Sequence, residues 1–244
     1  MRPEMILFDY GQTLICEDKF NPLAGDQALL DRAVKNPNHV GVREIQQVAA
    51  QMTKDIAESF PNANRSHHPL EITSECFNRY LYEYLDVEFD LEPQEMTDIF
   101  WDYSASGKPT KNIKKLLSYL KQEGIRTGVV SNMMFSGELL RRRLERMLPD
   151  FSFEFILTSS DYVFRKPYPQ IFRMALHKAE LPAEKIWFCG DNLLCDIQGS
   201  YDAGMKPIWY PVCIDGDYQV QTDVPYVEIG DWEELIGMLE EKRD

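Results

Sequence analysis

The chain has 244 residues, a formal net charge of −14 at pH 7, and 44% hydrophobic and 12% aromatic residues. This composition supports a packed core and excludes a disordered chain, and the length fits one large domain or two modest ones. The acidic balance argues against nucleic acid or an anionic membrane as a partner, because both favour basic surfaces. No apolar run approaches the ~20 residues of a membrane span. With no basic-then-apolar signal segment before the first motif, we expect a cytoplasmic protein.

The first predicted element is a short apolar strand at residues 4–9 that ends on a carboxylate. A buried parallel strand places such a side chain at its carboxyl end. Beyond it, four stretches carry apolar residues at helical spacing, and Pro-rich breaks separate them. These predicted helices span residues 23–34, 42–60, 70–85 and 94–103.

After residues 107–109 the pattern alternates between helices and strands. The predicted helices are residues 110–123, 137–147, 168–179, 194–203 and 232–241, and the predicted strands are 126–130, 153–157, 185–189, 207–210 and one near Tyr226. Such alternation is typical of right-handed crossovers and a mostly parallel sheet covered on both faces. We therefore predict a doubly wound α/β core, residues 1–16 and 105–244, with an inserted all-helical cap domain, residues 17–104.

Polar side chains end several of the predicted strands, where an open parallel sheet binds its ligand. Asp9 follows the first strand, Ser131-Asn132 the second and Gly190-Asp191 the fourth, while Lys166 precedes a helix after the third. Two carboxylates at one edge favour a hard cation such as Mg²⁺. The hydroxyl, amide and ammonium groups match a phosphoryl group, and a carboxylate can attack phosphorus. Each residue alone is more typical of a turn or a helix cap, but the ordered set favours phosphoryl chemistry.

Four segments in this order resemble the motifs of the haloacid dehalogenase superfamily of phosphohydrolases, and the resemblance covers the whole chain. The last two are the more specific, because several neighbours of the catalytic residues also match. The segments are residues 6–14 (Ile-Leu-Phe-Asp-Tyr-Gly-Gln-Thr-Leu), 129–132 (Val-Val-Ser-Asn), 165–172 (Arg-Lys-Pro-Tyr-Pro-Gln-Ile-Phe) and 189–199 (Cys-Gly-Asp-Asn-Leu-Leu-Cys-Asp-Ile-Gln-Gly).

The resemblance implies a Rossmann-like core, a helical cap over the site, Mg²⁺ as cofactor and a small phosphorylated metabolite as substrate. It implies that Asp9 is the nucleophile, that Ser131 binds the phosphoryl group and that Lys166 neutralises charge. The implied metal ligands are Asp9, the backbone carbonyl of Gly11, Asp191 and, as an auxiliary carboxylate, Asp196. The implied phosphate-binding residues are Gly11, Gln12, Thr13, Ser131, Asn132 and Lys166.

The first motif departs from this family at Gly11, where its phosphatases usually carry the aspartate that protonates the leaving oxygen and then activates water. Loss of such general acid–base catalysis typically costs about 10²–10⁴-fold in rate. Gln12 is no acid, and strand alternation predicts that Tyr10 points away from the crevice. Three accounts remain: a phosphatase that uses water or its substrate as the acid, one tuned to good leaving groups, or a non-catalytic phosphate-binding protein.

Dehalogenation is the rival chemistry in the same family. Its dehalogenases typically carry a tyrosine at the position of Gly11 and lack the metal-binding acid of the fourth motif. This chain keeps Asp191 and Asp196, and its tyrosine, Tyr10, lies one position early. We therefore rank dehalogenation below phosphoryl transfer, and a mutase is also disfavoured because it depends on the missing acid–base residue.

The charge is uneven along the chain. Residues 17–104 hold 7 basic and 17 acidic side chains, a net charge of −10, whereas the rest of the chain has a net charge of −4. Acidic groups in the crevice would disfavour highly anionic substrates. In the core, the basic run of residues 141–143 with Arg146 is predicted to form a solvated helix face, with the alternative that some of these charges bridge an interface.

Overall fold

The computed structural model describes residues 2–60, 69–214 and 221–242. A six-stranded sheet in the order β10-β9-β8-β1-β6-β7 forms its centre, and every neighbouring pair is parallel. The predicted α/β fold with a parallel sheet is confirmed. The strands are β1 (Met5–Phe8), β6 (Arg126–Ser131), β7 (Ile156–Thr158), β8 (Ile186–Gly190), β9 (Lys206–Trp209) and β10 (Val227–Glu228).

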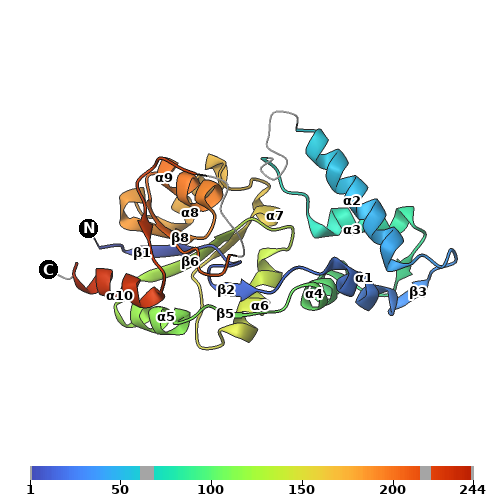
Figure 1. Cartoon of the computed structure of the whole chain (residues 1–244), viewed down its shortest axis with the longest axis horizontal. Coiled ribbons are helices and arrows are strands. Elements are labelled where there is room, and N and C mark those ends of the chain that lie inside the picture. Colours follow the sequence, from blue (N-terminus) through green and yellow to red (C-terminus); the bar gives the residue numbers. More distant parts are fainter. Residues whose placement is uncertain (1, 61–68, 215–220, 243–244) are drawn as a thin grey trace.

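Helices cover both faces of this sheet (Figure 1). All four residues of β1 are buried, and they alternate between two apolar clusters: Ile6 and Phe8 face one layer, Met5 and Leu7 the other. The first layer contains α5 (Ile113–Gln122), α6 (Gly137–Met147) and α10 (Trp232–Glu240). The second contains α8 (Pro169–Ala179), against which α9 (Gly199–Asp202) packs. A short helix, α7 (Ser159–Tyr162), follows β7.

The segment between the first strand and the rest of the core lies to one side of the sheet (Figure 1). It contains α1 (Pro22–Leu30), α2 (Val42–Glu58), α3 (Ser74–Tyr84) and α4 (Pro93–Ser104). A short antiparallel pair, β3 (Ala33–Lys35) with β4 (Glu88–Phe89), departs from the all-helical expectation. The segment has its own apolar cluster, which includes Leu29, Ile45 and Leu81. We keep residues 17–104 as the proposed cap and call them the cap segment.

The helix predicted at residues 23–34 ends at Leu30, because residues 33–35 pair with β4 instead. The helix predicted at residues 194–203 forms in two parts: a wide helical turn with π-type hydrogen bonding (η2, Leu193–Gln198) and then α9. A single 3₁₀ turn (η1, Ala183–Lys185) precedes β8. Among the helices described, none has the length and apolar character that crossing a membrane requires.

The two connections between the core and the cap segment are hydrogen-bonded to each other. β2 (Ile15–Glu17), which follows the first motif, pairs antiparallel with β5 (Gly107–Pro109), and Glu17 is opposite Gly107. A side-chain carbon on Gly107 would lie 2.9 Å from the Ile15 side chain. Glycine at this position therefore allows the two connecting strands to approach each other closely. The chain enters and leaves the cap segment at one place beside the sheet.

Candidate active site

Three of the four predicted motifs meet at the carboxyl edge of the sheet. Asp9 directly follows β1, and its N–H donates to the carbonyl of Cys189 on β8 at 2.9 Å. Ser131 is the last residue of β6, and Asp191 directly follows β8. Because β1 is hydrogen-bonded to both β6 and β8, the strand ends lie side by side. This edge is where parallel sheets bind ligands.

Lys166 joins this edge from the segment between β7 and α8. Its Nζ donates to Asp9 Oδ1 at 2.7 Å, to Asp196 Oδ1 at 2.6 Å and to the Val130 carbonyl at 2.8 Å. The side chain is 2% exposed. Burial alone would lower the pKa of Lys166, but the adjacent carboxylates of Asp196 and Asp9 outweigh it and raise that pKa above its usual value. The amine is therefore an ammonium at physiological pH.

Asn132 fixes the backbone that carries this lysine. Its side-chain Nδ2 donates to the Lys166 carbonyl at 2.8 Å, and its Oδ1 accepts from the Lys166 N–H at 2.7 Å. Both ends of the carboxamide are thus engaged with one residue of the third motif. The second motif therefore positions the lysine of the third, a role that the sequence did not indicate.

The fourth motif folds into a tight turn that directs Asp196 back to the sheet. The Asn192 side chain accepts from the N–H groups of Leu194 and Cys195 and so caps the following helical turn. The Asn192 N–H in turn donates to Asp196 Oδ2 at 2.9 Å. A side-chain carbon on Gly190 would lie 2.4 Å from the Asp196 Cβ, so glycine is required there for this close approach.

Three carboxylates converge in this turn region. One oxygen each of Asp9, Asp191 and Asp196 lies within 4.8 Å of the other two. Burial, followed by the charges of Asp196 and Asp9, raises the pKa of Asp191 well above its usual value. Lys166 supplies one positive charge against three carboxylates. The cluster therefore suits an additional cation, and its hard oxygen donors fit Mg²⁺.

The first-motif residues after Gly11 form a turn beside the cluster. Gln12 has a φ of 55°, in the left-handed region, and its Nε2 donates to the Glu17 carbonyl at 3.2 Å. Its buried Oε1 has no hydrogen-bond partner within the described ranges. Thr13 is fully buried, and its hydroxyl donates to Asp191 Oδ1 at 3.4 Å.

Ser131 is 3% exposed at the end of β6. The residue thus lies at the same edge of the sheet as Asp9, where the sequence predicted it. Whether the proposed phosphate-binding residues contact phosphate stays a prediction for all six: Gly11, Gln12, Thr13, Ser131, Asn132 and Lys166.

A second buried polar cluster, which we call the connection cluster, consists of Tyr10, Glu17 and Arg143. The Tyr10 hydroxyl donates to Glu17 Oε1 at 2.8 Å, and Arg143 Nε donates to the Tyr10 hydroxyl at 2.7 Å. Arg143 Nη2 lies 3.4 Å from Glu17 Oε1 and also donates to the Ala105 carbonyl. The cluster joins the first motif, β2, α6 and the end of the cap segment.

The prediction that residues 141–143 form a solvated face was wrong for Arg143, which is 2% exposed. The Trp101 ring on α4 lies under its guanidinium group, 4.4 Å from centroid to Cζ, and Asp102 accepts from its Nη1 at 3.0 Å. Glu17 likewise went unnoticed in the sequence. No motif marks either residue, because only the pairing of β2 with β5 and the packing of α4 on α6 bring them together.

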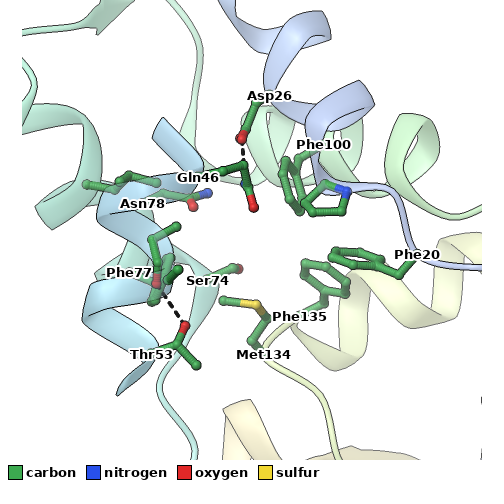
Figure 2. A pocket seen from close by; sticks show the side chains of 14 residues that line it. Phe20, Asp26, Gln46, Thr53, Ser74, Phe77, Asn78, Phe100, Met134 and Phe135 are labelled. Atoms are coloured by element: carbon green, nitrogen blue, oxygen red, sulfur yellow. Dashed lines mark hydrogen bonds between the residues drawn. The ribbon is translucent and has the colours of Figure 1, made fainter. Parts of the chain in front are cut away.

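A cavity of about 250 Å³ lies between the cap segment and the core loop after Ser131. Figure 2 shows the aromatic rings of Phe20, Phe100 and Phe135 on one side and the polar groups of Gln46 and Asn78 opposite. Gln46 Nε2 donates to the buried carboxylate of Asp26 at 2.6 Å. Met134 and Phe135 supply the core wall.

Comparisons with known proteins agree with this arrangement. A family model described as haloacid dehalogenase-like hydrolase matches residues 6–210. Glyceraldehyde 3-phosphate phosphatase of Pyrococcus furiosus is 25% identical over 249 aligned positions, which cover 98% of this chain and 92% of the relative.

Two solved structures share the fold over nearly their whole length. The 2-haloacid dehalogenase from Pseudomonas syringae has a TM-score of 0.68 at 21% identity, with 99% of both chains covered. The HAD phosphatase from Thermococcus onnurineus has a TM-score of 0.63 at 18% identity, with 100% of both covered. The family model spans most of the chain and includes all four strand-end motifs. The chain therefore belongs to the haloacid dehalogenase-like hydrolase family.

Proposed function

We propose that this protein is a Mg²⁺-dependent hydrolase of a small phosphate monoester, which acts through an aspartyl-phosphate on Asp9. The observation that carries this proposal is the buried group at the sheet edge, in which Lys166 contacts both Asp9 and Asp196 and Asp191 lies beside them. Phosphoryl transfer depends mainly on positioning and on the neutralisation of charge. The arrangement provides a carboxylate nucleophile with a cation held against it.

The residues of this edge divide the work as follows. A carboxylate oxygen of Asp9 would attack phosphorus, since the backbone hydrogen bond to β8 fixes its position. The Lys166 ammonium, which contacts Asp9, would bind a phosphoryl oxygen and neutralise its charge. The Ser131 hydroxyl would donate a hydrogen bond to another phosphoryl oxygen. Asn132 would act indirectly, because its side chain holds the backbone of Lys166.

Mg²⁺ would be held by Asp9, Asp191 and the backbone carbonyl of Gly11. Asp196 already accepts hydrogen bonds at both oxygens, from Lys166 and from Asn192, and would support the site as an auxiliary carboxylate. Bound there, Mg²⁺ would offset the repulsion between the carboxylates and the phosphoryl oxygens.

The cavity beside the cap segment favours a substrate with a small leaving group. The 250 Å³ cavity beside residues 134 and 135 is mostly apolar and small for a ligand pocket. Among the described residues that line it, only Asp26 carries a carboxylate. The relative from Pyrococcus furiosus is named for a three-carbon phosphate monoester. We therefore include three-carbon phosphate monoesters among the proposed substrates. Because the cap segment is acidic, we also expect neutral leaving groups to be preferred over polyphosphorylated ones.

The test measures phosphate release by the purified protein from triose, glycerol and sugar monophosphates and from p-nitrophenyl phosphate, with Mg²⁺ or with EDTA. We expect release with Mg²⁺ and none with EDTA. Asp9→Asn should abolish release, because an amide oxygen is a poor nucleophile. Asp31→Asn makes the same chemical change at an exposed position and should leave release unchanged. No release from any compound, or full activity of Asp9→Asn, would contradict the proposal.

Gly11 favours a second candidate, a phosphate-binding protein without turnover. A side-chain carbon at this position would meet its nearest neighbour at 3.8 Å, so an aspartate can be accommodated. Equilibrium binding of inorganic phosphate without turnover of any ester would favour this candidate. A large gain in turnover for Gly11→Asp at unchanged binding would identify a degraded enzyme. Dehalogenation is checked in the same preparation by halide release from 2-chloropropionate, and we expect none.

A further inference from the structure

The Glu17 carboxylate lies next to Gly11, the position at which the expected acid–base aspartate is missing. A side-chain carbon built on Gly11 would have Glu17 Oε2 as its nearest neighbour, at 3.8 Å, and among the described residues beyond the adjoining ones no other atom lies within 4 Å. The space that a side chain of residue 11 would occupy is therefore open, and the Glu17 carboxylate borders it. Six residues separate the two in sequence, and the turn from β1 into β2 brings them together.

The Glu17 carboxylate is held from the opposite side. Its Oε1 accepts the Tyr10 hydroxyl at 2.8 Å and lies 3.4 Å from Arg143 Nη2. Arg143 is itself fixed by Asp102 and by the Ala105 carbonyl. With Oε1 engaged by these donors, Oε2 is the oxygen that borders Gly11. The side chain is 20% exposed.

From this geometry we infer that Glu17 is the proton-transfer residue of the reaction, in place of the carboxylate that Gly11 lacks; the inference rests on the proposed function. In the first step the Asp9 oxygen bonds to phosphorus, the bond from phosphorus to the leaving oxygen breaks, and Glu17 gives that oxygen its proton. In the second step water bonds to phosphorus, its proton passes to the Glu17 carboxylate, and the bond from phosphorus to Asp9 breaks. Inorganic phosphate leaves, and both carboxyl groups return to their starting states.

Donors and charges on several sides act on the Glu17 carboxyl group. Burial raises its pKa, whereas hydrogen bonds from Tyr10 and Trp101 and the charge of Arg143 lower it, and the charge of Asp9 raises it again. The net effect is a pKa above the usual glutamate value.

The test uses Glu17→Gln and two substrates of similar shape, phenyl phosphate and p-nitrophenyl phosphate. Phenolate is the poorer leaving group and needs a proton, so the variant should lose about 10²-fold or more in kcat/KM with phenyl phosphate. p-Nitrophenolate leaves without a proton, so its first step should change little. Hydrolysis of the aspartyl-phosphate still needs a base, and the variant should therefore release a burst of about one p-nitrophenolate per active site, followed by a slow phase.

Two further variants separate proton transfer from a structural effect. Gly11→Asp combined with Glu17→Gln supplies a carboxylate at the usual position and should restore turnover of phenyl phosphate. Asp102→Asn replaces the other carboxylate that pairs with Arg143 but leaves Glu17 in place. It should keep the rates with both substrates within a few-fold of the wild-type rates. Thermal unfolding of each variant shows that the chain is folded.

The outcomes distinguish this inference from the proposed function. A wild-type protein that releases no phosphate overturns both. An active wild type with a Glu17→Gln variant that is unchanged, or that loses activity equally with both substrates and shows no burst, overturns the role of Glu17 alone. Failure of Gly11→Asp to rescue a folded Glu17→Gln variant also counts against it.

Discussion

The two buried polar clusters beside Asp9 are built in opposite ways. The core cluster, Asp9, Asp191, Asp196 and Lys166, comes from strand ends and loops of one parallel sheet, and it holds more negative than positive charge. The connection cluster, Tyr10, Glu17 and Arg143, joins the core to the cap segment, and its single guanidinium matches its single carboxylate. The first has the oxygen donors to hold a further cation, whereas the carboxylate of the second is paired with an arginine of the chain. We therefore expect the first to depend on ions and the second to contribute to stability.

The largest effect is expected for Lys166→Met. The substitution leaves the buried carboxylates of Asp9 and Asp196 without their ammonium, and loss of one partner of a buried ion pair costs about 3–5 kcal/mol. We expect the free energy of unfolding in urea to fall by about this amount without Mg²⁺ and phosphate release to disappear.

Mg²⁺ sharpens this test, because a cation near the carboxylates should recover part of the lost stability of Lys166→Met. The control is Lys115→Met, which removes an ion pair whose lysine is 63% exposed and should cost less than ~1 kcal/mol. A similar small loss for both variants would mean that the core cluster is not held by its lysine.

Arg143→Met should have the next largest effect. It removes the donors to Tyr10, Asp102 and the Ala105 carbonyl and leaves Glu17 without a cation. We expect a loss of ~3 kcal/mol in the free energy of unfolding, and Mg²⁺ should not recover it.

The matched control for this variant is Arg142→Met on the same helix, where the side chain is 41% exposed. Its loss should stay below ~1 kcal/mol. Equal losses for the two arginines, or recovery of Arg143→Met by Mg²⁺, would remove the distinction between the two clusters.

Asp231→Ala provides a reference outside both clusters. Asp231 caps α10 by accepting the Glu233 N–H at 3.0 Å, and it pairs with Lys111 at 2.8 Å. Loss of such a cap costs about 1 kcal/mol, and phosphate release should not change.

The pH dependence follows from the pKa of Asp231. Partial burial opposes ionisation, but the Glu233 N–H, Lys111 and Asn112 outweigh it and lower this pKa from 3.8 to about 2. The carboxylate is therefore more favourable in the folded state. Its contribution is fully present above the unfolded value and is lost as the pH falls toward 2. The stability difference between wild type and variant should shrink on acidification in urea titrations, and a constant difference would contradict the assignment.

The smallest effect is expected for Asp26→Asn in the cap segment. Burial raises the pKa of Asp26, and hydrogen bonds from Gln46 and Tyr82 only partly offset it. A carboxyl group with a raised folded pKa destabilises the fold as the pH rises above its unfolded pKa. The variant should match the wild-type melting temperature near pH 4 and exceed it slightly at pH 7. A lower melting temperature at pH 7 would show that the charged form is required.

The core cluster was largely predictable because two of its members, Asp9 and Asp191, directly follow short apolar strands. A strand such as residues 5–8 is recognisable locally, and parallel strands place their carboxyl ends together whatever the loops do. Asp9, Ser131 and Asp191 were placed correctly by this rule. The role of Asn132 was not, since only the structure shows that its amide engages the backbone of Lys166.

The connection cluster could not be predicted from the sequence, because it depends on contacts between distant segments. Glu17 and Arg143 are separated by 126 residues, and the strand that orients Glu17 has three residues and includes no strong apolar alternation. The predicted end of α1 was wrong for a similar reason. Residues 33–35 pair with residues 88–89, and this pairing outweighs the helical spacing of the apolar residues. Local patterns do not report such pairings.

The pairing of β2 with β5 has a consequence for how this architecture can change over time. A core whose insertion starts and finishes at adjacent residues tolerates an exchange of that insertion, because the cost of closing a loop rises only slowly with its length. Residues 15–17 and 107–109 form such a junction. The chemistry at the sheet edge could thus be retained while the segment that selects the substrate is replaced as a unit. Glu17 is the last residue of β2 and lies on the junction itself, so a proton donor at this position would be retained wherever the exchanged segment begins after residue 17.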